Sequence, residues 1–408
     1  MTVAHLWGTD TGSWTRIAAS KNLFHAGARR RLESIDLLRG LVMVLMALDH
    51  TRDFFGAGGV NPRDFADTAL FLTRWVTHFC APTFIFLAGI SAFLYGARGR
   101  SIGDVSRFLA SRGLWLILLE FTLVRIGWSF DLHFDLMVAQ VIWAIGASMV
   151  LLAGLVYLPR WAIAAVGLTM IAGHNLLDGV RPEQLGAAGW LWHVLHQPGF
   201  VALGPHTKLF VLYPLIPWAG VMAVGYAIGP VFHLDRPTRE RLLLTAGVAL
   251  TAGFIVLRAT NVYGDPAPWA VQDTRLATVL SFLSCEKYPP SLLYLMMTLG
   301  PTLILLALCE RVHGRIAGWV AAFGRVPLFF YVLHIFLIHA LAVALAWATV
   351  GDVGWLFDPP PRQRPPGFGL SLLGVYVVWI FVVVALQPLC RWFAALKQRR
   401  REWWWSYL

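Results

Sequence analysis

Ten long apolar stretches divide this sequence, and they constrain its fold more than any other feature. They cover approximately residues 34–55, 72–96, 107–128, 136–158, 160–177, 208–232, 241–259, 290–309, 326–350 and 369–390. Because about 20 apolar residues cross a bilayer as a helix, each stretch is long enough or nearly long enough to span one. We therefore predict an all-α membrane bundle of about ten transmembrane helices over residues 34–390, between a basic N-terminal segment (1–33) and a basic C-terminal tail (391–408).

The charged residues support this prediction. Only 13% of the 408 residues are charged, against roughly 25% in an average soluble domain, which excludes a multi-domain soluble protein. The net charge of +11 could indicate nucleic-acid binding, but basic runs such as 29–31 and 399–401 flank apolar stretches and form no basic face. The cations flanking the side that holds both termini are about twice as numerous as those on the other side. This bias predicts that both termini are cytoplasmic. Because the cations are explained by membrane anchoring, we expect no nucleic-acid partner.

The first apolar stretch contains most of the intramembrane charge. With 100° per residue, Asp36, Arg39, His50 and Asp53 fall on one helical stripe. Arg39 and His50 lie about 16 Å apart along the axis, so the stripe could line a tunnel through the bilayer. Alternatively, Asp36 and Arg39 pair at the helix end while His50 binds a carbonyl of a neighbouring helix.

The second stretch contains a proline four residues after a histidine. Pro82 cannot donate to the carbonyl of His78, so we expect a bend there and a freed backbone oxygen. This would create a polar site in mid-span. The alternative is a packing kink, in which Ala88, Ala92 and Gly96 present a face of small residues to a neighbour.

Two further stretches contain polar residues five apart. His334 and His339 point about 140° from each other and cannot serve one site; we expect at most one to face the bundle core, and Tyr331 favours His334. By the same spacing, Glu120 and Arg125 should pair with other helices and not with each other. The four cysteines show no CxxC spacing and predict no zinc site, hence no metal.

The string RLESIDLLRGLVMVLMALDHTRDFF, followed by HFCAPTFIFLAGISAFLYG, resembles bacterial members of the heparan-alpha-glucosaminide N-acetyltransferase-like family, within the transmembrane acyltransferase superfamily. The segments 213–229, 289–301 and 324–340 are similar to the same family. The most specific part is the S-x-D-x-x-R-G opening, and Arg39 to His50 matches the superfamily's spacing of an arginine, ten residues and a histidine. One departure is that residues 56–72 contain no histidine, whereas the animal lysosomal enzyme has its proposed catalytic histidine in this loop.

The resemblance implies transfer of an acyl group, usually acetyl from cytoplasmic acetyl-CoA, to a sugar amine or hydroxyl across the membrane, here a bacterial plasma membrane. We expect His50 to be the general base, with Asp53 orienting it and with His78 and His334 as competitors. Arg39 and Asp36 are the residues of the first span that we expect to contact the donor. Further donor contacts would come from four cytoplasmic arginines, which membrane anchoring also explains: Arg98, Arg100, Arg107 and Arg112. A transporter or flippase and a non-catalytic scaffold remain alternatives, and the acceptor, N- or O-transfer and any oligomer are left open.

Overall fold

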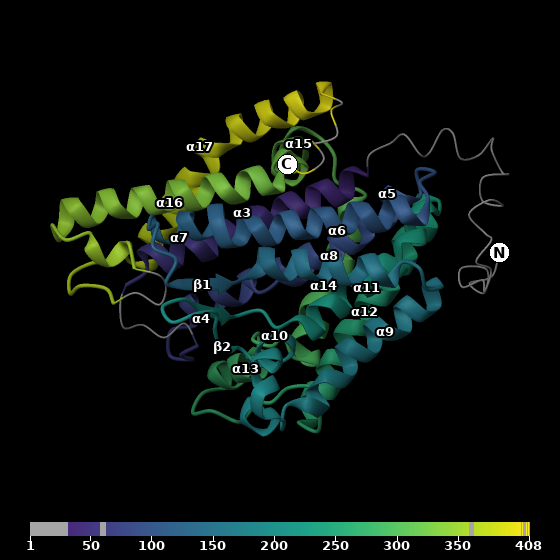
Figure 1. The fold of residues 1–408 in the computed structure, drawn as a ribbon, viewed down its shortest axis with the longest axis horizontal. Coiled ribbons are helices and arrows are strands. Elements are labelled where there is room, and N and C mark those ends of the chain that lie inside the picture. Colours follow the sequence, from purple (N-terminus) through teal and green to yellow (C-terminus); the bar gives the residue numbers. More distant parts are fainter. Residues whose placement is uncertain are drawn as a thin grey trace.

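The computed structural model describes residues 32–57, 63–358 and 363–400, together with residues 402, 405 and 407. The predicted N-terminal segment thus lies almost entirely outside the described residues. Helices make up 72% of the structure, which confirms the predicted helical bundle in outline. Figure 1 shows long helices lying roughly side by side, with shorter elements gathered at one side.

Most of the α-helices overlap the predicted apolar stretches, whereas three shorter ones, at 189–195, 275–283 and 315–325, lie between them. In chain order the α-helices are α3 (Glu33–Phe55), α4 (Thr68–Thr77), α5 (Cys80–Gly96), α6 (Ile102–Leu119), α7 (Arg125–Ser129), α8 (Val141–Leu155), α9 (Arg160–Gly173), α10 (Gly189–Leu195), α11 (Leu215–Ala227), α12 (Arg236–Thr260), α13 (Arg275–Leu283), α14 (Leu292–Cys309), α15 (Arg315–Arg325), α16 (Pro327–Thr349) and α17 (Leu372–Arg399). Short helical turns of other types are η2 (Glu120–Val124), η3 (His174–Leu177), η4 (Pro182–Ala188), η5 (Gly229–His233) and η6 (Gly354–Leu356).

Fewer helices qualify as membrane spans than the ten predicted. Within the described residues, six helical segments are long and apolar enough to cross a bilayer: Thr68–Gly96, Leu215–His233, Arg236–Thr260, Leu292–Cys309, Pro327–Thr349 and Leu372–Arg399. A seventh results if Arg160–Leu177 and Pro182–Leu195, bent by 115°, are one broken span. The long α3 is not among them because charged residues are distributed along its length. The count of ten and the orientation of the termini are therefore not confirmed.

Helix α3 lies at the centre of the bundle, in contact with α5, α14, α15, α16 and α17. Its contact with α15 is very close, because Gly40 and Gly324 face each other. A Cβ atom built on Gly324 would lie 1.9 Å from the carbonyl oxygen of Asp36. Without a hydrophobic driving force in lipid, small residues that allow such backbone contact are what hold membrane helices together.

The helix is interrupted between α4 and α5, at the position where the sequence predicts a bend, although the two parts together form one candidate span. Helix α4 ends at Thr77 and α5 begins at Cys80, so the break falls at His78, four residues before Pro82. The freed carbonyl of His78 accepts a hydrogen bond of 2.8 Å from the Tyr294 hydroxyl of α14. A neighbouring helix therefore satisfies the oxygen that proline leaves without a donor.

A small sheet corrects the all-α prediction. Strand β3 (Lys208–Val211) pairs parallel with β1 (Leu136–Ala139) and antiparallel with β2 (Gly199–Ala202), in the order β1-β3-β2. Two predicted spans, 136–158 and 208–232, therefore begin as strands. One cause is Pro214, which biases the residue before it towards extended backbone and forms the N-cap of α11.

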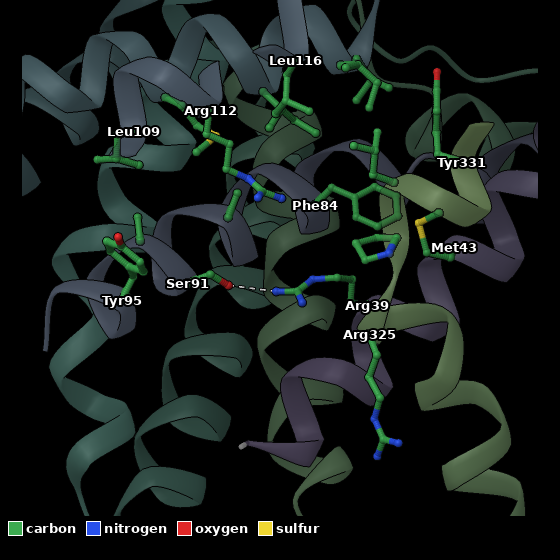
Figure 2. A pocket seen from close by; sticks show the side chains of 18 of the residues that line it. Arg39, Met43, Phe84, Ser91, Tyr95, Leu109, Arg112, Leu116, Arg325 and Tyr331 are labelled. Atoms are coloured by element: carbon green, nitrogen blue, oxygen red, sulfur yellow. Dashed lines mark hydrogen bonds between the residues drawn. The ribbon is translucent and has the colours of Figure 1, made fainter. Parts of the chain in front are cut away.

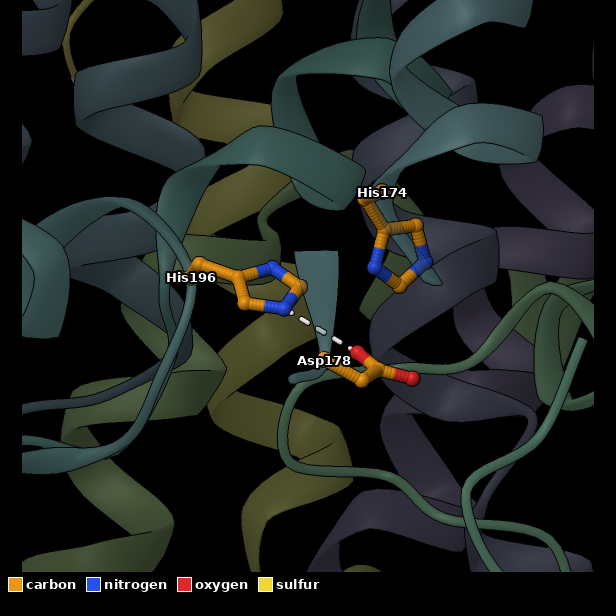
Figure 3. Close-up of side chains that lie close together, drawn as sticks. All are labelled: His174, Asp178 and His196. Carbon is orange, nitrogen blue, oxygen red and sulfur yellow. Dashed lines mark hydrogen bonds and ion pairs between the residues drawn. The ribbon is translucent and has the colours of Figure 1, made fainter. Parts of the chain in front are cut away.

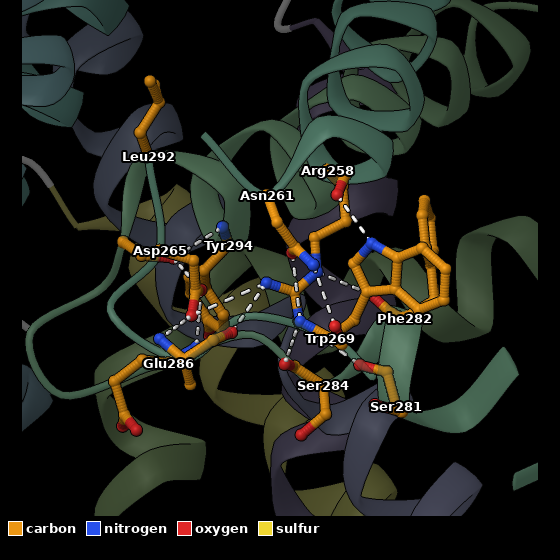
Figure 4. A network of polar contacts seen from close by, with 12 residues as sticks. Arg258, Asn261, Asp265, Trp269, Ser281, Phe282, Ser284, Glu286, Leu292 and Tyr294 are labelled. Atoms are coloured by element: carbon orange, nitrogen blue, oxygen red, sulfur yellow. Dashed lines mark hydrogen bonds and ion pairs between the residues drawn. The ribbon is translucent and has the colours of Figure 1, made fainter. Parts of the chain in front are cut away.

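A buried arginine holds the long segment 260–289 against the bundle (Figure 4). The guanidinium of Arg258, 1% exposed, donates to four backbone carbonyls, those of Ala267, Ser281, Phe282 and Ser284. By its position at the end of an apolar stretch, Arg258 looks like an ordinary flanking cation. Its contacts show a structural role, since a buried guanidinium can direct its five N–H groups to several acceptors at once.

Candidate active site

A cavity of about 330 Å³ lies between α3, α5, α6, α8 and the junction of α15 with α16. Its walls are largely apolar, as is typical of sites for small molecules. Figure 2 shows side chains from these helices directed into the same space. The apolar lining includes Met43, Phe84, Leu109, Leu116, Ile142 and Met149.

Five cations line this cavity: Arg39, Arg98, Arg112, Arg325 and Lys397. Arg39 donates to the Ser91 hydroxyl at 2.9 Å and to the Gly324 carbonyl at 3.3 Å. In Figure 2, Arg112 extends towards the same region from α6. Five cationic side chains in a mostly apolar cavity are suited to a ligand that combines anionic and apolar parts.

Asp36 does not line the cavity, in contrast to the expectation that it would contact a donor. Its carboxylate oxygens lie 3.6 Å from the Arg39 guanidinium and 3.8 Å from that of Arg325. Asp36 therefore sits behind the two arginines and offsets their charge. This matches the alternative in which Asp36 and Arg39 form a pair near the helix start.

The four arginines that were predicted to lie on the cytoplasmic side and bind a donor divide into two pairs. Arg98 and Arg112 line the cavity, but Arg100 and Arg107 do not. The Arg100 guanidinium lies over the Tyr95 ring, 4.1 Å from its centroid, and the exposed Arg107 pairs with Asp104 at 2.6 Å. Arg325 and Lys397 also line the cavity, but nothing in the sequence distinguishes them from other flanking cations, because their place depends on contacts between distant segments.

Two histidines meet close to the inner part of the cavity. Nδ1 of His50 lies 2.7 Å from Nε2 of His334, and both side chains are buried. Tyr331, which lines the cavity, has its ring centroid 6.0 Å from that of His50 and 5.5 Å from that of His334. Tyr331 thus connects the cavity wall with the histidine pair.

The hydrogen bonds of this pair determine its tautomers. Nδ1 of His334 lies 3.0 Å from the Phe330 carbonyl, which can only accept, so this nitrogen carries a proton. In a neutral His334, Nε2 must then accept, and the 2.7 Å contact requires that Nδ1 of His50 donates. A neutral His50 consequently has its lone pair on Nε2, the form in which an imidazole acts as a base.

Asp53 does not orient His50, which corrects the sequence-based expectation. The Asp53 carboxylate, 44% exposed, accepts from Arg52 at 2.9 Å, while the Nδ1 of His50 is directed to His334. The helical stripe predicts that Asp53 shares a face of α3 with His50. At the last turn of α3, however, the Asp53 side chain lies at the surface. His334 occupies the position expected for Asp53.

The other intramembrane residues lie elsewhere. His78 is buried at the α4–α5 break, against Tyr294, and within the described residues its ring nitrogens have no hydrogen-bond partner. His334 and His339 are both fully buried, so the expectation that at most one faces the core is wrong; His339 bonds the Gly127 carbonyl. Other helices cover both faces of α16.

Glu120 and Arg125 have separate partners, as predicted. Glu120 accepts from the backbone N–H of Trp143, at the start of α8. Arg125 pairs at 3.0 Å with Asp131, in the loop that follows its own helix, so the expectation of a partner on another helix is wrong for Arg125.

A partly buried polar cluster lies around Asp49, the residue before His50, and none of its residues lines the cationic cavity. Asp49 accepts hydrogen bonds from Arg52 at 2.7 Å and from the Thr77 hydroxyl at 2.9 Å. Lys287 is also buried here. Burial by itself would lower the pKa of Lys287, but the Tyr288 hydroxyl and the Asp49 carboxylate outweigh it and raise the pKa above its usual value. Lys287 is therefore a cation at neutral pH.

Residues 31–258 match the family model described as heparan-alpha-glucosaminide N-acetyltransferase, catalytic. The match covers more than half of the chain. The chain belongs to this family. Membership of the heparan-alpha-glucosaminide N-acetyltransferase family indicates an acetyltransferase-type membrane enzyme. No curated protein matches the chain. The matched residues include Arg39 and His50, and they end before Arg325, His334 and Lys397.

Proposed function

We propose that this protein is a membrane acetyltransferase that takes acetyl from acetyl-CoA bound in the cationic cavity and transfers it to an amine or hydroxyl of a sugar. The observation that carries the proposal is the position of Tyr331. It lines the cavity and at the same time contacts His50 and His334. A donor held by the cations would thus present its thioester to a basic group.

The cavity divides in a way that suits the parts of the donor. Arg98, which follows the end of α5, and Lys397, near the end of α17, would meet the phosphates, with Arg39 and Arg112 deeper inside. The methionine and leucine side chains would enclose the pantetheine arm. His50 lies about 16 Å further along α3 than Arg39, so the acetyl end would arrive near the histidine pair.

The transfer itself needs a base and a donor to the developing oxyanion. As the acceptor nitrogen or oxygen attacks the acetyl carbonyl, its proton passes to Nε2 of His50 and a new C–N or C–O bond forms. The C–S bond then breaks, and CoA leaves as a thiolate that takes the proton. The Tyr331 hydroxyl is our candidate for stabilising the oxyanion. Its side chain lines the cavity, and its ring contacts both His50 and His334.

The acceptor would approach from the other side of His50. The cluster of Asp49, Arg52 and Lys287 brings together one carboxylate and two cations, of which Lys287 is buried and the other two are partly buried. Sugar hydroxyls can both donate to a carboxylate and accept from cations, so this cluster has the chemistry to hold a sugar. In this proposal the donor and the acceptor would reach the histidine pair from different sides, and acetyl would pass across the membrane in one step.

Binding and turnover of the purified protein test the proposal. We expect acetyl-CoA to bind, and CoA thiol to appear when an amino sugar such as glucosamine is added. Arg112→Ala should weaken acetyl-CoA binding, while Arg107→Ala, a change of the same type outside the cavity, should not. Absence of acetyl-CoA binding at millimolar concentration would overturn the proposal. Movement of sugar into proteoliposomes without CoA release would favour the transporter instead.

A further inference from the structure

A second group of polar side chains lies outside the candidate active site, at the bend between two helical segments (Figure 3). His174 begins η3, Asp178 follows it, and His196 follows α10 on the far side of the 115° bend. One ligand atom from each of the three lies within 4.8 Å of the others. Two residues separated by the bend are thereby brought to one point.

The hydrogen bonding of this group is incomplete. His196 Nε2 bonds the Asp178 carboxylate at 3.0 Å, but Nδ1 of His196 is buried without a partner. His174 is 1% exposed, and in the part of the chain that the structure describes neither ring nitrogen makes a well-formed hydrogen bond, although the backbone of Pro290 lies nearby. Buried polar atoms without partners are rare in proteins and indicate a missing ligand or a functional role.

We infer that His174, Asp178 and His196 form a binding site for a divalent transition-metal ion of the zinc class. Two imidazoles and a carboxylate are a ligand set that zinc takes in proteins. Ligand atoms bonded to zinc at about 2.0–2.1 Å stand roughly 3.3 Å apart, so the three side chains need to close by an ångström or so. Asp178 is partly exposed, which leaves it free to adjust and leaves a fourth position to water.

The surroundings contain the supporting contacts that metal sites usually have. The second carboxylate oxygen of Asp178 accepts from the Asn175 amide at 2.9 Å, and the Asn175 oxygen accepts from the Leu292 backbone N–H of α14 at 2.9 Å. Such contacts orient a ligating carboxylate. An ion pair between Asp178 and His196 alone would not explain why the polar side chain of His174 is buried beside them. A metal explains all three residues together.

A bound ion would brace the bend. It would join η3, at the end of α9, to the end of α10, and so fix the segment that leads into β2. This role is independent of the proposed acetyl transfer, because none of the three residues lines the cationic cavity. We expect the metal to stabilise the folded protein, as any ligand that binds only the folded state does.

Metal content and thermal stability test this inference. The protein is purified without a polyhistidine tag, stripped with a chelator, loaded with ZnCl₂ and freed of excess metal. We expect stoichiometric zinc by mass spectrometry, a rise in Tm of several degrees that chelator reverses, and visible absorption typical of low-coordinate Co²⁺ after cobalt loading. The inference would be overturned if the protein retained no more zinc than a control membrane protein that lacks the site.

The variants separate this site from other histidines. Asp178→Asn and His174→Asn should lose the bound zinc and the gain in Tm. His193→Asn, on α10 but bonded to the Gln197 carbonyl, should keep both. If His174→Asn fails to fold, Asp178→Asn, at a partly exposed position, decides the matter. Zinc retained equally by Asp178→Asn and the unmodified protein would contradict the assignment.

Discussion

Nδ1 of His50 on α3 lies 2.7 Å from Nε2 of His334 on α16, although the two residues are 284 positions apart in the chain. The carbonyl of Phe330 holds the opposite nitrogen of His334, so a series of hydrogen bonds leads from the backbone of α16 to His50. In this arrangement His334 would act as a positioning residue, and His50 alone would exchange a proton with the substrate.

His50→Ala should lower kcat by about 10²- to 10⁴-fold, the usual cost of losing a general base. Donor affinity should stay nearly unchanged, because the histidine lies beyond the cations. His334→Ala should cause a smaller loss, and His334→Gln should restore part of it, since an amide oxygen can accept from Nδ1 of His50. Steady-state kinetics and acetyl-CoA calorimetry measure both effects. Full activity of His50→Ala, with loss in His78→Ala, would move the base to the α4–α5 break.

Arg98→Ala and Arg112→Ala should each weaken acetyl-CoA binding by about 10- to 100-fold, because a hydrogen bond to a charged group contributes about 1.5–3 kcal/mol. Arg100→Ala and Arg107→Ala are matched controls, since these arginines bind Tyr95 and Asp104 instead of lining the cavity. Calorimetry with acetyl-CoA and with 3′-dephospho-CoA shows which arginine meets the 3′-phosphate. Equal losses in all four variants would indicate a general charge effect in place of a binding site.

Tyr331→Phe should reduce kcat and leave the dissociation constant of acetyl-CoA within about twofold, because only the hydroxyl is removed. The aromatic ring, which packs against His50 and His334, is kept. Parallel measurements of kcat and donor binding distinguish the outcomes. A loss of binding with unchanged kcat would mean that the hydroxyl contacts the donor in its ground state.

Reporter fusions after Gly264 and after Leu408 should report opposite compartments if both termini are cytoplasmic. The expectation rests on the excess of flanking cations on the side of the termini. Paired alkaline phosphatase and fluorescent protein fusions provide the measurement. The same compartment for both positions would show that the predicted topology is wrong.

Gly324→Ala should destabilise the bundle, because its methyl group would collide with the Asp36 carbonyl and push α15 away from α3. Overpacking of this kind typically costs about 1–3 kcal/mol. Gly318→Ala on the same helix is the control, since a Cβ there meets no atom within 4 Å and alanine favours helix. Thermal unfolding in detergent should show a lower Tm for Gly324→Ala only.

Local rules predicted much of this molecule. Apolar length located the helices, and the missing N–H of Pro82 placed the break at His78. Helical spacing correctly separated His334 from His339. Each of these features depends on residues within a few positions of one another, so the pattern along the chain is sufficient.

Features that depend on contacts between distant segments were not predicted. Periodicity shows which face of α3 holds His50, but not that His334 meets it, so Asp53 was assigned a role that its exposed position excludes. The same limit hid Arg325 and Lys397. The three-stranded sheet was missed because four-residue strands next to long apolar helices leave no separate signal in composition.

Helix α17 supplies Lys397 to a cavity that begins with Arg39 near the start of α3, so segments far apart in the sequence form its walls. A ribosome must therefore synthesise α17 before the proposed donor site has all five of its cations. Removal of the end of α17 should weaken the binding of acetyl-CoA while leaving His50 and His334 in place. The proposed donor site is in this way completed late in the synthesis of the bundle.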